Sequence, residues 1–150
     1  MTYAHAHTRG VATVPIIFVF GILTVAIGIG ITALAFSETF SSQASYNAAR
    51  ALLYAETGAR DALERVARDK DYSCPATDCY TLDINVNGCS DGSACALVSV
   101  SAGEGSVVDP KIITSKGQAG LHARRLNVEI VFDPALDGEI ASTTWSEITN

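Results

Sequence analysis

The chain has 150 residues, of which 48% are hydrophobic and 17% charged, with a formal net charge of −6. All sixteen acidic residues and nine of the ten Lys/Arg lie beyond residue 36, so the excess of negative charge is confined to that part. A surface that grips phosphates needs clustered basic residues, and this composition therefore argues against direct nucleic-acid binding. The part of the chain beyond residue 36 is long enough for one small domain.

The first predicted element is a helix of membrane length. The segment from Val11 to Phe36 carries no charged residue. It is longer than the ~20 apolar residues that cross a bilayer, and longer than the ~7–15-residue core of a cleavable signal peptide. Thr13 and Pro15 favour a helix start, because proline in the first turn lacks an N–H that would be unpaired anyway. Signal cleavage at Ala35 is the alternative.

Charges on either side of this segment predict its orientation. Arg9 precedes it, and Glu38 is the first charge after it. The positive-inside bias therefore places the N-terminus in the cytoplasm and the part beyond Phe36 outside. The four cysteines all lie in the exported part, which suits an oxidising compartment.

The apolar segment also contains three glycines, Gly21, Gly28 and Gly30. Glycine is common in transmembrane helices, which is one interpretation. The other is that these positions allow close helix–helix approach, or local unwinding in an assembly.

The helical period continues from Ser37 to about Lys70. One narrow apolar stripe recurs at steps of four and three, formed by Ala48, Leu52, Ala55, Ala59, Ala62 and Val66. Charged residues at i,i+4 spacing occupy the other faces and favour a solvated helix. Gly58 interrupts this pattern at a cost of about 1 kcal/mol relative to alanine. We predict one helix of more than fifty residues, ended by Cys74-Pro75.

Short strands are predicted after the helix. Apolar residues alternate with polar ones in three segments: Leu82, Ile84 and Val86; Ala96, Val98 and Val100; and Leu126, Val128, Ile130 and Phe132. Residues 111–115 predict a further strand, with Gly117 and Gly120 in a hairpin connection to the Leu126 strand. The tail from Gly138 to Ile148 adds an edge strand through Ile140 and Trp145. The predicted fold class is α+β, with the helix stripe packed on one face of a small antiparallel sheet.

The cysteines have the spacing Cys-x4-Cys-x9-Cys-x5-Cys, which differs from the two-residue knuckles of most zinc sites. We therefore predict disulfides, for which three connectivities exist. Local pairs, Cys74–Cys79 and Cys89–Cys95, are favoured because both would pin turn-rich loops without apolar residues of their own.

A weak calcium-loop pattern lies between the first two predicted strands. Its candidate ligands are Asp83, Asn85, Asn87 and Asp91. The twelfth position of a calcium loop should be a bidentate Glu, and here it is Ala94. Because Ile84 and Val86 also fit a strand and Asn87-Gly88 is a hairpin-turn signal, strand and turn are favoured over a metal site.

No arrangement of catalytic residues is recognisable in the sequence. It has no Gly-x-Ser-x-Gly elbow, paired-His metal motif or phosphate loop. The single exported histidine, His122, lies in the Gly-rich connection beside Arg124 and Arg125, and we predict a solvated loop position for it. We expect no enzyme activity, cofactor or metal.

Three features together resemble the type IV pilin superfamily over the whole chain. They are the leader ending at Arg9-Gly10-Val11, the apolar run, and the alanine-rich helix at 46–60, which is similar to that of PilX-type minor pilins. Residues 113–117 followed by 125–128 also look like the hairpin common in pilin ectodomains.

The resemblance implies a processing and assembly sequence. A prepilin peptidase would cut after Gly10 and methylate the new amino group of Val11. Residues 1–10 would then be the leader, 11–36 the membrane and filament-core half of the helix, 37–72 its amphipathic half, and 73–150 the sheet domain. The implied partners are the lipid bilayer, the membrane-embedded assembly machinery and other pilin subunits in an extracellular filament.

One residue departs from the family pattern. Most pilins carry a Glu at the fifth mature position, which is Pro15 here. A carboxylate in the apolar filament core is costly without its partner, so its absence fits a minor subunit that starts or tips a filament. The alternatives are a type II secretion pseudopilin, an unprocessed single-pass adhesin or receptor, and a secreted binding module.

Overall fold

The computed structural model describes residues 13–135 and 139–148, which form two compact units that meet between Ser42 and Gln43. One helix, α1 (Thr13–Arg68), belongs to both units. The remaining elements are β1 (Tyr80–Asp83), β2 (Cys95–Val100), β3 (Lys111–Ala119), β4 (His122–Phe132) and β5 (Ile140–Ile148). The helix has 56 residues, which confirms the prediction of one helix longer than fifty.

The first unit consists of the N-terminal part of α1. Every side chain from Val14 to Ser42 is exposed. No polar or charged residue from Val14 to Phe36 other than Thr24 and Thr32 interrupts its apolar surface. This half of the helix therefore packs against nothing in the described chain.

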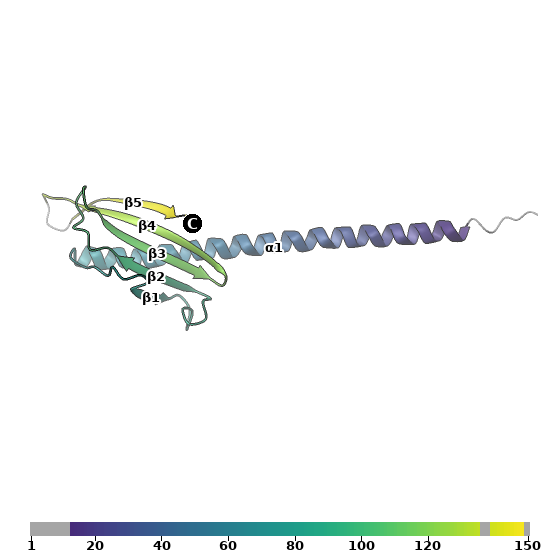
Figure 1. The fold of residues 1–150 in the computed structure, drawn as a ribbon, viewed down its shortest axis with the longest axis horizontal. Helices are drawn as coiled ribbons and strands as arrows, with labels where there is room; N and C mark the ends of the chain where they lie inside the picture. Colours follow the sequence, from purple (N-terminus) through teal and green to yellow (C-terminus); the bar gives the residue numbers. More distant parts are fainter. Residues whose placement is uncertain (1–12, 136–138, 149–150) are drawn as a thin grey trace, which may run out of the picture. The chain divides into compact units, whose positions relative to one another are not determined.

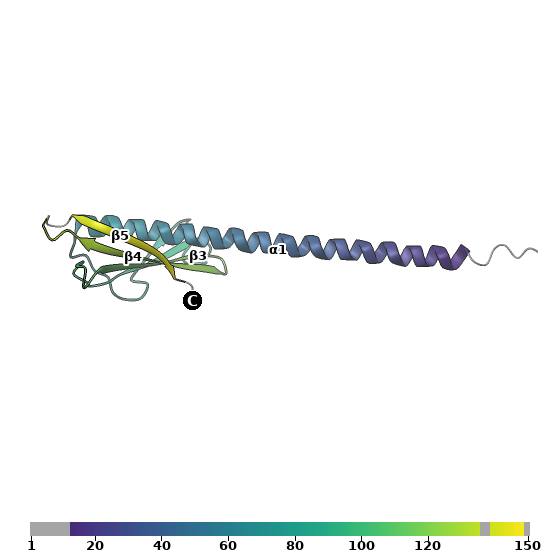
Figure 2. The ribbon, with the colours of Figure 1, turned by 90° about the horizontal axis from the view of Figure 1, so that it is seen from above.

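The second unit is an α+β domain, as the sequence predicts. Its five strands are all antiparallel to their neighbours and follow the order β1-β2-β3-β4-β5, so each strand pairs with the next one along the chain. The part of α1 after Gln43 lies along one face of this sheet (Figures 1 and 2). The other face is left open and carries mainly polar side chains of β3, β4 and β5.

The predicted alanine stripe forms the helix side of the core. Ala55, Ala59, Ala62 and Val66 are completely buried. On the sheet side the core consists of Val98, Val100, Ile113, Leu126, Val128 and Ile130. Because alanine has only a methyl group, the helix backbone approaches the sheet closely along this line.

Two glycines lie where this approach is closest. A Cβ on Gly58 would lie 2.6 Å from Ser115 Oγ and 2.8 Å from the Cβ of Ala96. A Cβ on Gly117 would collide with the backbone of Ala51 and Ala55. The helix penalty expected at Gly58 is thus offset by contact with the sheet, which no larger residue permits.

The helix ends earlier than Cys74-Pro75 suggests. After Arg68, the amide of Asp69 still donates to Arg65 O at 3.0 Å, and the amide of Tyr72 then donates to Asp69 O to form a turn. Lys111 is buried below this turn and donates from Nζ to Tyr72 O at 3.0 Å. A strand residue thereby satisfies a carbonyl of the segment that leaves the helix.

Strand boundaries differ from prediction at two places. β1 ends at Asp83, so the prediction that Ile84 and Val86 belong to this strand is wrong. Val86 lies in the loop that follows and is 91% exposed. β3 continues to Ala119 and includes Gly117, which was expected in the connection. The hairpin turn is reduced to Gly120 and Leu121, and the φ of +61° at Gly120 suits the first position of a type II′ turn.

The predicted edge strand is present as β5. It pairs with β4 from Ile140 to Ile148, apart from a register shift at Ala141, and Trp145 lies opposite Val128 on the face that meets the helix. The guanidinium carbon of Arg60 lies 5.9 Å from the centroid of the Trp145 ring. The single tryptophan therefore reports on the contact between α1 and the sheet edge.

Candidate functional site

The apolar part of α1 is the largest candidate interaction surface. Among the described residues, α1 is the one helix long and apolar enough to cross a membrane, with a window of mean hydropathy 2.6 that is not buried at all. Its hydroxyl groups bond within the helix: Thr24 Oγ1 donates to Gly21 O at 2.9 Å and Thr32 Oγ1 to Gly28 O at 2.8 Å. These bonds remove the need for water, which suits an apolar surrounding.

The three glycines of this segment have open space around them. A Cβ on Gly21, Gly28 or Gly30 would meet no atom within 4 Å outside the helix itself. Nothing in the described residues therefore requires glycine at these positions. Any requirement for small residues there would arise from a partner that approaches the helix, in line with the second interpretation above.

The predicted processing residues, Gly10 and Val11, lie outside the described residues. Pro15 lies in the first turn of α1, as the sequence predicts. Glu38, the first acidic residue of the chain, is exposed on α1 well beyond this turn.

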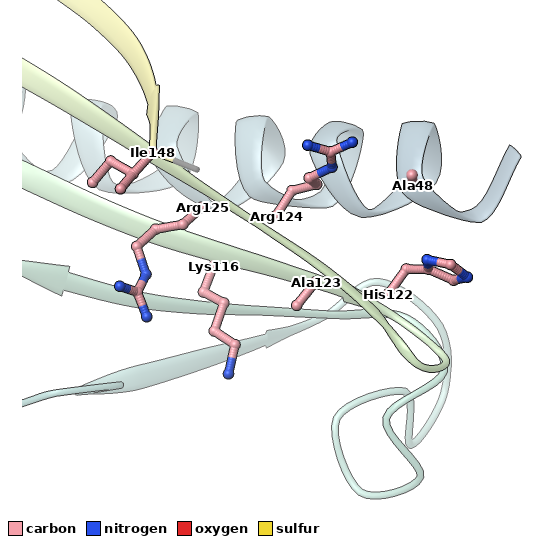
Figure 3. A pocket seen from close by; sticks show the side chains of 7 residues that line it. All are labelled: Ala48, Lys116, His122, Ala123, Arg124, Arg125 and Ile148. Atoms are coloured by element: carbon pink, nitrogen blue, oxygen red, sulfur yellow. The ribbon is translucent and has the colours of Figure 1, made fainter. Parts of the chain in front are cut away.

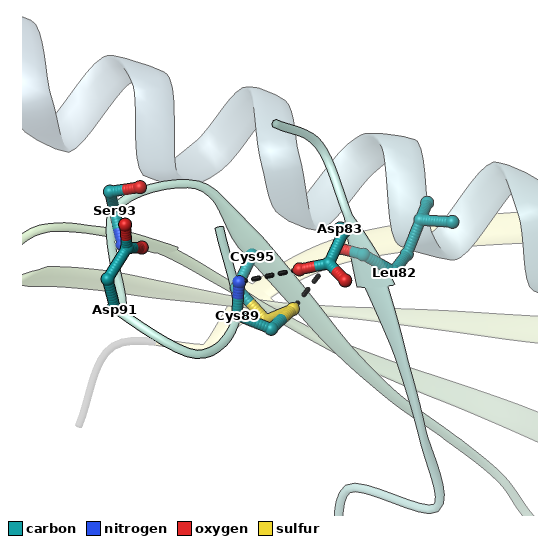
Figure 4. Close-up of a disulfide and its surroundings, with 6 residues drawn as sticks. All are labelled: Leu82, Asp83, Cys89, Asp91, Ser93 and Cys95. Carbon is teal, nitrogen blue, oxygen red and sulfur yellow. Dashed lines mark hydrogen bonds between the residues drawn. A yellow bond between two sulfur atoms is a disulfide. The ribbon is translucent and has the colours of Figure 1, made fainter. Parts of the chain in front are cut away.

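Both disulfides are local, as favoured from the sequence. Cys74 pairs with Cys79 at a Cα–Cα distance of 5.8 Å, and Cys89 pairs with Cys95 at 4.6 Å. Cys74 also exchanges two backbone hydrogen bonds with Val100, which attaches the first bridge to the sheet. The second bridge joins the loop 84–94 to the first residue of β2 (Figure 4).

The two carboxylates of the calcium-loop pattern, Asp83 and Asp91, accept hydrogen bonds from different backbone amides of the loop 84–94. Asp83 Oδ1 accepts a hydrogen bond from the amide of Cys89 at 2.7 Å, whereas Asp91 Oδ1 accepts one from the amide of Ser93 at 3.0 Å (Figure 4). Hydrogen bonds from Ser93 lower the pKa of Asp91. Within residues 13–135 and 139–148 no three His, Cys, Asp or Glu side chains are placed to share a metal ion.

The backbone of the same loop explains its asparagine. Asn87 has a φ of +61°, a left-handed conformation that asparagine tolerates better than most residues. The backbone carbonyl oxygen of Asn85 accepts a hydrogen bond from the amide of Gly88 at 2.9 Å. Asn87-Gly88 thus forms a turn inside a long loop, and not the tight two-residue hairpin that such a pair favours.

A basic depression was not anticipated from the sequence. It has a volume of about 350 Å³ and is lined by Ala48, Lys116, His122, Ala123, Arg124, Arg125 and Ile148 (Figure 3). The prediction of a loop position for His122 is wrong, because His122 is the first residue of β4 and is half-buried. The early start of β4 follows from the two-residue turn that precedes it.

Two cations of the depression stand side by side without a counter-ion. Lys116 and Arg125 are direct cross-strand neighbours, and both extend to the same side of the sheet (Figure 3). In the described part of the chain neither has an ion-pair or hydrogen-bond partner, whereas Arg124 pairs with Glu147 at 2.9 Å. Like charges directly opposite each other are unfavourable unless an anion approaches them.

This pair follows from strand register. Gly120-Leu121 as a two-residue turn would have predicted that positions 116 and 125 face each other. Placing Gly117 in the connection shortened the predicted β3 and concealed the pair. The useful signal was Gly120, the glycine that can start a type II′ turn.

A polar cluster on the opposite side of the domain is structural. Asp61 accepts hydrogen bonds from Arg65 Nε at 2.9 Å and from Tyr80 Oη at 3.0 Å. The guanidinium of Arg65 also covers the Tyr80 ring at 4.4 Å. Burial, and then the hydrogen bond to Asp61, raise the pKa of Tyr80. These contacts connect α1 to the short edge strand β1.

No protein family model, characterised protein or solved structure matches this chain.

Proposed function

We propose that the chain is a minor subunit of a type IV pilus or pilus-like filament and has no catalytic role. The observation that carries the proposal is the unequal use of α1. Its residues after Gln43 are fitted to the sheet, whereas the apolar side chains from Val14 to Phe36 are all exposed. Such a helix requires a lipid environment or other apolar helices around it.

A filament subunit occupies both environments in turn, first the lipid bilayer and then a bundle of other apolar helices. Before assembly, the apolar part of α1 crosses the membrane as a single span, with the second unit outside. During assembly, helix–helix contacts replace lipid contacts, and Gly21, Gly28 and Gly30 allow neighbouring helices to approach closely. The hydroxyls bonded within the helix are satisfied in both surroundings.

The leader junction supports the same proposal. Arg9-Gly10 immediately precedes the apolar segment, where a prepilin peptidase would cut and methylate Val11. Because residue 15 is a proline and not an acidic residue, the apolar surface carries no unpaired carboxylate there. This favours a minor subunit over a major one. The two disulfides suit a domain that is exposed outside the cell.

Intact-mass analysis of the chain purified from its native membrane tests the proposal. We expect a mature chain that begins at N-methylated Val11, and Gly10→Leu should leave the leader attached. Gly21→Ala, a change of glycine within the span, is the matched control and should leave cleavage intact. Retention of Met1 in the wild type would instead indicate an anchored adhesin or receptor, and a start at Phe36 would indicate a secreted module.

A type II secretion pseudopilin would be processed in the same way. The location of the mature chain separates this alternative from a pilus subunit. We expect the chain in surface filaments that are sheared from the cells and purified. Recovery only from the cell envelope would favour the pseudopilin.

A further inference from the structure

The hairpin formed by β3 and β4 is the basic part of an acidic domain. Residues 111–128 include four Lys/Arg and no Asp/Glu, whereas the rest of the chain beyond residue 36 has five Lys/Arg and sixteen Asp/Glu. Lys111 is buried below the turn that follows α1. The partly exposed cations Lys116, Arg124 and Arg125 therefore gather in the half of the hairpin next to its two-residue turn.

Apolar side chains project from the same end of the domain. Leu121, in the turn of the hairpin, is completely exposed, and Val86 is exposed in the loop 84–94. The turn and the loop are joined, because the amide of Gly120 donates to Gly92 O at 2.9 Å. They therefore support each other before any partner arrives, which lowers the entropy cost of binding.

The carboxylates near this end already have partners. Glu147 forms an ion pair with an arginine of β4, and the carboxylates of Asp83 and Asp91 accept hydrogen bonds from backbone amides. Lys116 and Arg125 are cross-strand neighbours on the open face of the sheet, and neither has such a partner among the residues that the structure describes. An anion is the partner that two adjacent cations lack.

The hairpin turn lies at the end of the domain where α1 enters it. Ala44 and Ala48 line one depression together with His122, the residue after the turn. Ala44 follows Phe36, the last residue of the uncharged segment, by eight positions, which is about 12 Å of helix at about 1.5 Å per residue. A lipid headgroup layer is roughly 5–7 Å thick on each side of a bilayer. Where the apolar segment spans a membrane, the length of the chain therefore keeps the turn close to the membrane surface.

The far end of the domain exposes an apolar side chain among acidic residues. Val108 is 95% exposed in the loop 104–109, which also contains Glu104 and Asp109. This loop adjoins the last residue of β4, so the eleven residues of that strand separate it from Leu121 by roughly 35 Å at about 3.3 Å per residue. Both ends expose apolar side chains, and only the end at the hairpin turn combines them with cations that lack a counter-ion.

We infer that the turn of the β3–β4 hairpin docks on the surface of a bilayer that contains anionic lipids. Leu121 enters the headgroup layer, and Lys116 and Arg125 meet lipid phosphates, because long basic side chains reach toward such an interface. The inference rests on the proposed function, in which α1 spans a membrane before assembly.

Fluorescence quenching in vesicles tests the contact. The full chain with Trp145→Phe and Leu121→Trp has one tryptophan, at the hairpin turn, and is reconstituted into vesicles of phosphatidylcholine and phosphatidylglycerol. Replacing these lipids by analogues brominated near the headgroup end of the acyl chains should reduce the emission about twofold, because a side chain at the headgroup–acyl boundary meets the bromine atoms.

Val108→Trp in the same Trp145→Phe background is the matched control at the far end of the domain. Its emission should not change when the brominated lipids are introduced. Unquenched emission from position 121, or equal quenching from positions 121 and 108, would overturn the inference.

The role of the two cations is tested in the background with tryptophan at position 121. Lys116→Glu with Arg125→Glu should reduce the quenching about threefold, because anionic lipids then repel the hairpin. Vesicles of phosphatidylcholine alone, which carry no net charge, should give a similar reduction. Arg68→Glu with Lys70→Glu makes the same change in net charge near the end of α1 and should leave the quenching intact. An equal loss in both pairs of variants would contradict docking through Lys116 and Arg125.

Circular dichroism of each variant establishes that the fold is retained. The quenching result is independent of the mature N-terminus, on which the proposed function depends. A chain that starts at methylated Val11 but shows no quenching at position 121 is a filament subunit whose domain stays clear of the membrane, and the inference is then wrong. Quenching in a chain that retains Met1 would support the docking surface and contradict the filament.

Discussion

At the scale of single residues, the role of Gly58 depends on what lies opposite. In an isolated helix it is a defect worth about 1 kcal/mol. In the domain it lies against Ser115, Ala96 and Val98, and any side chain there would enter occupied space. Ser115 itself is fully buried, and its hydroxyl has no hydrogen-bond partner in the described chain.

Gly58→Ala should therefore destabilise the domain despite the higher helix propensity of alanine. We expect a loss of about 1–3 kcal/mol, because the added methyl group forces the helix away from β2 and β3. Urea unfolding in micelles, followed by the fluorescence of Trp145 at the helix–sheet contact, measures the change. Thr57→Ala, on the exposed side of the same turn, is the matched control, and an equal loss there would contradict the explanation.

Ser115→Ala should be neutral or stabilising on its own. It removes a buried hydroxyl that has no hydrogen-bond partner and leaves the methylene group in place. Combined with Gly58→Ala it should recover part of the lost stability, because the nearest of the three contacts, at 2.6 Å, disappears. The same unfolding measurement on the double variant tests this coupling, and strict additivity of the two changes would count against it.

Tyr80 should make stability depend on pH in the alkaline range. Its pKa is raised in the folded state by burial and by the hydrogen bond to Asp61, whereas in the unfolded chain it is about 10. The contribution of the protonated tyrosine is therefore complete below pH 10. It is lost as the pH rises above 10, because only the unfolded state then releases the proton.

Tyr80→Phe should accordingly cost about 0.5–1.5 kcal/mol at pH 8, through the lost hydrogen bond to Asp61. The difference in melting temperature between wild type and variant should shrink between pH 8 and pH 10.5. Tyr46→Phe, which changes an exposed tyrosine of α1, is the control and should keep the pH dependence of the wild type. A gap for Tyr80→Phe that stays constant with pH would exclude the proposed linkage.

At the scale of elements, α1 shows how one helix serves two surroundings. The helical period is unbroken, but the apolar residues surround the helix before Phe36 and narrow to an alanine stripe after Ala48. The loops that follow α1 bury little apolar surface of their own. The two disulfides hold them, the first against β2 and the second around the loop 84–94.

Removing either disulfide should lower the free energy of unfolding by about 2 kcal/mol, as chain entropy predicts for loops this short. We expect the variants Cys74→Ser with Cys79→Ser, and Cys89→Ser with Cys95→Ser, to be additive when combined, because the bridges close separate loops. Urea unfolding of the full chain in micelles measures both. A change below about 0.5 kcal/mol would show that the loops are held by other contacts.

At the scale of the whole molecule, two features have no partner within the described part of the chain: the apolar surface of the first unit and the pair formed by Lys116 and Arg125. Both are costly in an isolated chain, the first through exposed apolar area and the second through adjacent like charges. The filament proposed above would remove the first cost, because other apolar helices would surround this surface.

Much of the fold follows from local pattern. The long helix, the alanine stripe, the alternating strand around Val128 and the edge strand through Trp145 are all present in the structure. Period and composition were enough for these because each element buries one face that the sequence marks with apolar residues. Local cysteine pairing was likewise favoured correctly, from the character of the loops that the bridges close.

The sequence by itself determined that this chain has an uncharged helix of membrane length, an α+β domain and a candidate leader junction. Only the tertiary structure decided that Gly58 and Gly117 are contact points, that Ile84 and Val86 leave the strand, and that Lys116 stands beside Arg125. The physical reason is that these outcomes depend on strand register and on the distance between helix and sheet. Both are set by residues far apart in the chain, whereas periodicity reports only on neighbours.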